Sequence, residues 1–103
     1  MWAQLITMRL KPGREGDVAT FLDHLRDAEQ PGSGLIRTSA FADQKDPLRV
    51  FVMPVFESEE MARARESDPR RTEALAPMRD MMADFLDGPP EFVDLIVLKE
   101  VTN

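Results

Sequence analysis

Residues 48–61, LRVFVMPVFESEEM, decide the fold, because an apolar strand runs directly into an acidic helix start. Residues 48–56 are rich in valine and phenylalanine, which favour strands. Ser58 is a suitable N-cap, and Glu59 and Glu60 in the first turn favour the positive end of the helix dipole. Pro54 has no N–H to donate, so we expect this strand at a sheet edge or with a bulge at that point.

Upstream of this stretch the pattern predicts a strand, a helix and a second strand. Residues 2–11 alternate, and Pro12 and Gly13 end this strand. Apolar residues in 14–30 recur at helical spacing, and the helix should stop at Pro31 and Gly32. Residues 35–43 form the next strand, and a turn at 44–47 joins it to residues 48–56 in a hairpin.

Downstream, the helix that begins after Ser58 is interrupted at Asp68 and Pro69. Asp68 can cap a new helix whose first residue is Pro69, a position where proline is well tolerated. This second helix carries an apolar stripe, with Pro77 a candidate for a kink, and residues 88–90, GPP, end it. Residues 91–101 are the last strand.

This order of elements predicts one α+β domain over residues 1–103. We expect a ferredoxin-like βαββαβ fold, with a four-stranded antiparallel sheet and its helices on one face. Several strands are apolar on both faces, as Leu5, Phe51, Leu95 and Val97 show. The face without helices should therefore pack against something, and a second copy of the chain is the simple partner. We expect a homodimer through this sheet face.

Composition excludes several classes of function. A net charge of -6 would repel phosphate backbones, so no nucleic-acid partner is expected. The chain has no cysteine and one histidine, His24, so we expect neither a thiolate nor a multi-histidine metal site. No dinucleotide fingerprint is present, so no cofactor is expected. No apolar run is long enough to cross a membrane, and no signal-peptide block precedes the first strand, so a cytoplasmic protein is expected.

Four short motifs follow one another along the chain: RLKPG at 9–13, FESEE at 56–60, DPR at 68–70 followed by Glu73, and GPP at 88–90. Together they resemble the antibiotic-biosynthesis-monooxygenase-like (ABM) superfamily of dimeric α/β barrels. Their order and spacing cover nearly the whole chain. The resemblance implies the ferredoxin-like fold, a homodimer, and a cofactor-independent monooxygenase acting on an aromatic or polyketide-like small molecule.

The chain departs from the catalytic members at their polar positions. Where those members carry an Asn and a Trp on the third strand, this chain has Val52 and Phe56. Their Tyr falls near Ala62 and their Arg near Leu75. Their haem-degrading branch would need an axial His, and His24 lies on the first helix. A second function therefore stays open, that of a non-catalytic dimer that binds a small ligand or only assembles.

Any ligand site should lie between the sheet and the helices and be mainly apolar. We expect it near Arg37, Met53, Phe56 and Met78, because methionines can line an adaptable pocket and Arg37 can supply a polar group. His24 is expected at the surface. The arginines of the two later helices should be neutralised by neighbouring carboxylates on a solvated face, which is the alternative to an anion site. They are Arg63, Arg65, Arg70, Arg71 and Arg79.

Overall fold

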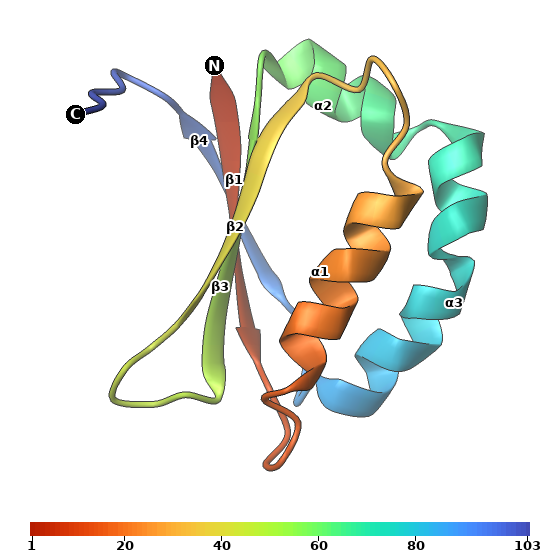
Figure 1. Ribbon diagram of the computed structural model, residues 1–103, viewed down its shortest axis with the longest axis vertical. Coiled ribbons are helices and arrows are strands. Elements are labelled where there is room, and N and C mark those ends of the chain that lie inside the picture. Colours follow the sequence, from red (N-terminus) through yellow and green to blue (C-terminus); the bar gives the residue numbers. More distant parts are fainter.

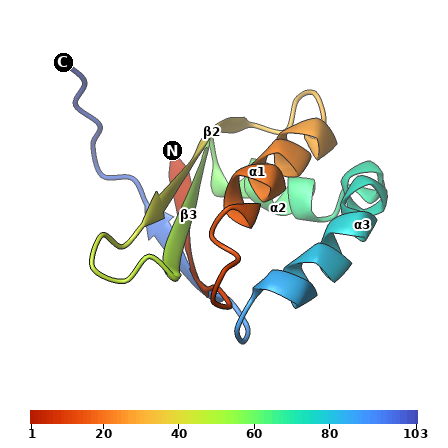
Figure 2. The same cartoon turned by 60° about the horizontal axis from the view of Figure 1, so that its bottom comes forward.

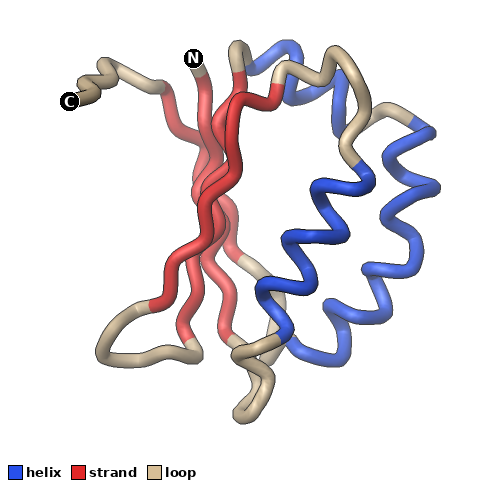
Figure 3. Tube along the Cα trace, in the orientation of Figure 1, coloured by secondary structure: helices blue, strands red, loops and turns tan.

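The computed structural model describes residues 1–103 and has four strands and three helices. The strands are β1 (Trp2–Arg9), β2 (Leu35–Ala42), β3 (Arg49–Phe56) and β4 (Glu91–Ile96), and the helices are α1 (Asp17–Ala28), α2 (Glu59–Glu66) and α3 (Pro69–Phe85). All neighbouring strands are antiparallel, in the order β2-β3-β1-β4. The sheet stands edge-on in Figure 1 with α1 and α3 on one side of it, and Figure 3 shows the same two layers by secondary structure. The expected α+β ferredoxin-like fold is confirmed.

Alternation along the strands assigns every side chain to the helix-covered face or to the open face. Trp2, Ile6 and Met8 of β1 contribute to the core under the helices, and Phe21 of α1 meets Phe85 of α3 there with ring centroids 5.6 Å apart. Leu10, just after β1, is also buried and bridges to Leu86. Phe85 is fully buried.

A side-chain cap marks the start of α2 and another marks the start of α3. The backbone N–H of Met61 donates to Ser58 Oγ at 3.2 Å, and that of Arg70 donates to Asp68 Oδ1 at 2.9 Å. Pro69 is the first residue of α3. The predicted break in the helix is therefore correct, and it lets the chain turn from α2, across the top of the sheet, into α3, which packs beside α1 (Figure 2).

Gly34 allows α2 to approach the start of β2. Its φ is +80°, and a Cβ built there would lie 2.8 Å from the Met61 Cβ, so a larger residue would displace α2. This close approach places α2 against one end of the sheet.

The structure corrects the expectation for Pro54. β3 lies between β2 and β1, so it is an interior strand and not an edge. The missing N–H is accommodated by a gap in the ladder, because β1 pairs with β3 through Trp2 and Ala3 and again from Ile6 onward. The register shift of the sheet lies in β2, between Leu35 and Arg37.

Element ends also differ from the predicted ones. β4 ends at Ile96, and residues 97–103 continue without regular structure on the side of the sheet opposite to the helices (Figure 1). α1 is shorter than predicted at both ends, since the chain turns at 14–16 and leaves the helix before Pro31. α3 continues through Pro77. None of the helices combines the length and the apolar character that a bilayer crossing needs.

Candidate functional site

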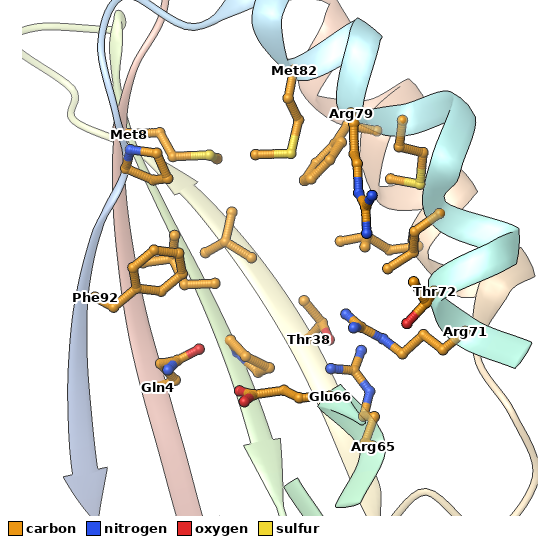
Figure 4. A pocket seen from close by; sticks show the side chains of 18 of the residues that line it. Gln4, Met8, Thr38, Arg65, Glu66, Arg71, Thr72, Arg79, Met82 and Phe92 are labelled. Carbon is orange, nitrogen blue, oxygen red and sulfur yellow. The ribbon is translucent and has the colours of Figure 1, made fainter. Parts of the chain in front are cut away.

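A cavity of about 370 Å³ lies between the helix-covered face of the sheet and the three helices (Figure 4). This volume is within the range of small-molecule sites, which begins at roughly 300 Å³. Its walls are mainly apolar and come from both layers. The apolar lining is Ile6, Met8, Phe21, Leu25, Val52, Pro54, Phe56, Leu75, Met78, Met82, Pro90 and Phe92.

Polar side chains gather at the part of the cavity below α2. The polar lining is Gln4, Thr38, Arg65, Glu66, Arg71, Thr72 and Arg79. Arg65 and Glu66 end α2, whereas Arg71, Thr72 and Arg79 project from α3, and Figure 4 shows the Arg71 and Arg79 side chains pointing into the space between the layers. Glu66 is the single carboxylate of the lining.

Arg65 is held by a carboxylate and by an aromatic ring. Its Nε lies 2.6 and 2.8 Å from the two carboxylate oxygens of Glu29, and its guanidinium lies 5.2 Å from the centre of the Phe56 ring. Only 11% of the Arg65 side chain is exposed. The pair joins the end of α2 to the end of α1 and neutralises one charge beside the cavity.

Arg71 is half-buried and has no carboxylate within ion-pair distance. Burial is the main cause that lowers the pKa of its guanidinium, and the neighbouring Arg65 charge adds to the effect. An arginine stays protonated in spite of such a shift. The charges of Glu29 and Glu66 oppose this pKa shift in part, but neither carboxylate forms an ion pair with Arg71.

A polar network joins α2 to β1 and to the edge strand β4 beside the cavity. Arg63 Nη2 donates to Asp94 Oδ2 at 2.8 Å, and Gln4 Nε2 donates to Asp94 Oδ1 at 3.0 Å. The Arg63 guanidinium also lies 5.0 Å from the centre of the Trp2 ring. The hydrogen bond from Gln4 and then that from Arg63 lower the pKa of Asp94. These contacts attach α2 to β1 and β4 and fix Gln4 at the cavity wall.

The structure separates the four residues that the sequence analysis grouped as one ligand site. Phe56 and Met78 line the cavity. Arg37 and Met53 lie on the open face, because they pair in register with Val55 and Ser39, one residue out of phase with the cavity-lining Thr38 and Pro54. Arg37 instead forms an ion pair with Glu100. Side-chain alternation thus removes two of the four residues from this cavity.

His24 is exposed on α1, as expected, and lies in a shallow depression between α1 and α3 outside the cavity. The cavity lining contains no histidine, cysteine or tyrosine. It therefore lacks a His, Cys or Tyr that could be the proximal ligand of haem, and methionine thioethers are the only side chains of the lining that ligate haem iron in other proteins.

Sequence reasoning missed Glu66, Arg71 and Arg79 as cavity residues. The available signal was helical spacing: Arg71, Leu75, Met78 and Met82 recur along one face of α3, so the apolar stripe that packs inward carries a cation at its first position. Val52, Phe56 and Leu75, three of the positions where catalytic ABM members carry polar side chains, do line the cavity.

No protein-family model matches the sequence, and no curated protein matches it. Solved structures do match over nearly the whole chain. A Nitrosomonas europaea protein provisionally named antibiotic biosynthesis monooxygenase is 16% identical over 96% of this chain and all of its own, with a TM-score of 0.73. A Bordetella bronchiseptica protein with the same provisional name is 14% identical over 95% of this chain and 97% of its own, with a TM-score of 0.75.

A mutant of MhuD, solved with two manganese protoporphyrin IX molecules bound per active site, is 17% identical over the full length of both chains, with a TM-score of 0.80. At these identities the likeness concerns the fold. It confirms the resemblance to ABM-like structures at that level.

Proposed function

We propose that this chain, which has the fold of ABM-like structures, binds a small, flat and mainly apolar molecule in the cavity between its sheet and its helices. The observation that carries the proposal is the cavity itself, about 370 Å³ with walls from both layers. Phe21, Phe56 and Phe92 supply aromatic walls, and three methionines, Met8, Met78 and Met82, supply adaptable ones. The porphyrins bound in the MhuD mutant are flat aromatic molecules held by the same fold, which supports this ligand class.

The proposal is tested by filling the cavity from α3. Leu75 lines the cavity and is half-buried, so Leu75→Phe should occlude it; Leu22→Phe makes the same change at a half-buried position outside the lining. With anthrone or naphthol at tenfold excess over a micromolar Kd, the wild type should gain about 1.4 kcal/mol, which raises Tm by several degrees for a domain of this size.

Leu22→Phe should retain this rise in Tm, and Leu75→Phe should lose it. An equal rise in both variants would place the ligand elsewhere. No rise in the wild type across a panel of polycyclic phenols and ketones would contradict the proposal.

Oxygenation of the bound molecule is a second candidate function, and Glu66 is the observation that favours it. A carboxylate at the cavity wall can accept a proton from an acidic C–H of an anthrone-type substrate. The carbanion would then reduce O₂, form a C–OOH bond and lose water, so that CH₂ and O₂ become C=O and H₂O without a cofactor. The apolar residues Val52, Phe56 and Leu75 would restrict water around the carbanion.

This candidate requires oxygen uptake that depends on Glu66. Glu66→Gln should reduce anthrone-dependent oxygen uptake by about 100-fold or more, within the range that general-base catalysis supplies. Glu73→Gln changes an exposed carboxylate of α3 outside the cavity and is the matched control. Equal uptake by Glu66→Gln and the wild type would exclude Glu66 as the base, and no uptake by the wild type would leave ligand binding as the function.

We further propose that the chain acts as a homodimer through the open face of the sheet. Phe41 and Val93 on this face are 51% and 49% exposed, and Leu5, Phe51 and Leu95 lie half-buried beside them. The order β2-β3-β1-β4 joins these side chains across all four strands. An apolar face of this kind is stabilised when a second copy covers it.

A further inference from the structure

Arg71 and Arg79 differ from every other arginine of the chain. All the others lie within 4 Å of a carboxylate: Arg9, Arg14, Arg26, Arg37, Arg49, Arg63, Arg65 and Arg70. The two exceptions both line the cavity. The two arginines without a carboxylate partner therefore lie at one wall of one cavity.

The two cations bracket an apolar segment of α3. They are eight positions apart, which corresponds to about 12 Å along a helix, and Leu75 and Met78 face the cavity between them. In Figure 4 the Arg71 side chain extends from α3 toward the sheet, whereas the Arg79 side chain runs along α3 toward Arg71. Arg71 is the more enclosed of the two, being half-buried where Arg79 is exposed.

The two carboxylates whose charge reaches Arg71, Glu29 and Glu66, form their ion pairs with other arginines. Glu29 is already bound to Arg65, and Glu66 lies 3.5 Å from Arg63. Burying a charge without a partner is costly, so a site of this kind gains from an anion supplied by a ligand. A guanidinium binds a carboxylate with two parallel hydrogen bonds, which fixes orientation as well as charge.

We propose that Arg71 binds a carboxylate of the cavity ligand, so that the ligand class is a flat aromatic acid whose ring system lies against Leu75, Met78 and Phe92. This inference rests on the proposed function, since it assumes that the cavity is a ligand site. Arg79 lies farther along α3. It adds positive potential near the aromatic end of the ligand and does not bind the ligand carboxylate directly.

The experiment compares two probes of equal shape and different charge by calorimetric titration at low salt. Naphthoate carries the carboxylate, and naphthamide replaces it with a neutral amide. The wild type should bind naphthoate at least about tenfold more tightly than naphthamide, as expected for a charge-assisted pair. Arg71→Gln should abolish this preference, and Arg71→Lys should restore part of it.

Arg26→Gln is the matched control, because it removes one positive charge from an exposed position on α1 outside the cavity. It should leave the preference unchanged. A preference that survives in Arg71→Gln would overturn the assignment to Arg71. Should Arg71→Gln fail to fold, the naphthoate preference of the wild type and its reduction in Arg71→Lys decide the same question.

The two proposals fail in different ways. Equal affinity of the wild type for naphthoate and naphthamide, with both excluded by Leu75→Phe, would overturn the carboxylate inference and support the cavity as a ligand site. Absence of binding by either probe, together with no response to neutral polycyclic phenols, would overturn both.

Discussion

The arginines of α2 and α3 show that one residue type has three different surroundings within a short segment. Arg63 and Arg70 are solvated and paired with nearby carboxylates, as their spacing predicts. Arg65 turns inward and pairs with Glu29 on α1, a contact between distant segments that no local spacing reveals. Arg71 faces the cavity without a partner. The prediction of a solvated, neutralised face holds for the first two residues and is wrong for Arg71.

Local sequence patterns also place only some of the candidate ligand residues correctly. Phe56 and Met78 were identified correctly as cavity lining, because both belong to apolar patterns that must pack inward. Arg37 and Met53 were not, because strands with apolar residues on both faces give no internal sign of which face the helices cover. That choice depends on the packing of the whole sheet, and a single shift by one residue reverses it.

At the scale of elements, the break between α2 and α3 depends on Asp68. Its carboxylate accepts from the backbone N–H of Arg70 and pairs with the Arg70 side chain. The Arg70 side-chain hydrogen bond is the largest cause that lowers the pKa of Asp68 below its ordinary 3.8, followed by the backbone hydrogen bond. The charged form is therefore stabilised by folding.

We expect Asp68→Asn to lower the free energy of unfolding at neutral pH, since asparagine can cap the helix but cannot carry the charge. Because the folded pKa is depressed, the advantage of the wild type is fully present above about pH 3.9 and is lost as pH falls through the lower, folded pKa. Denaturant titrations of both proteins between pH 7 and pH 3 measure this difference. Asp80→Asn, an exposed change on the same helix, is the control.

A difference between wild type and Asp68→Asn that stays constant over this pH range would contradict the role of the Asp68 charge. A loss of stability in Asp80→Asn equal to that in Asp68→Asn would show instead that any charge removed from α3 has the same effect.

The starts of helices were predictable from the sequence where capping residues specify them. Ser58, Asp68 and Pro69 fix the starts of α2 and α3 through their own backbone contacts, and the structure confirms both starts. For Pro54 the missing N–H was taken as evidence of an edge or a bulge; the edge is wrong, because an interior strand tolerates the proline with a local gap in pairing. Strand order depends on contacts between distant segments, so the sequence near Pro54 does not indicate whether the strand is interior or at an edge.

At the scale of the whole molecule, the fold has one face covered by helices and one uncovered (Figures 1 and 2). The two faces suit two roles: the covered face contains the cavity, and the open face carries the apolar side chains proposed for dimerisation. The residues that follow β4 run past this open face, where Glu100 pairs with Arg37 of β2. Such an arrangement keeps the assembly surface and the ligand surface on opposite sides of one sheet.

The homodimer should sediment at about twice the 11.7 kDa of the chain. Leu95→Lys places a charge on the open face, which costs several kcal/mol if it is buried in an interface, so this variant should sediment as a monomer or unfold. Ile96→Lys changes the next residue of β4, which points to the opposite face and is 78% exposed, and it should remain a dimer. A folded, monomeric wild type at micromolar concentration would contradict dimerisation.

The cavity as a ligand site is tested most directly by methyl NMR of the protein labelled at its methionines. Met8, Met78 and Met82 line the cavity, whereas Met53 lies on the open face and Met1 is exposed at the start of β1. Titration with naphthol should shift the methyl signals of Met8, Met78 and Met82 through the ring current of the bound molecule and leave those of Met1 and Met53 in place. Shifts confined to Met53, or no shift at any methionine at millimolar naphthol, would contradict the account.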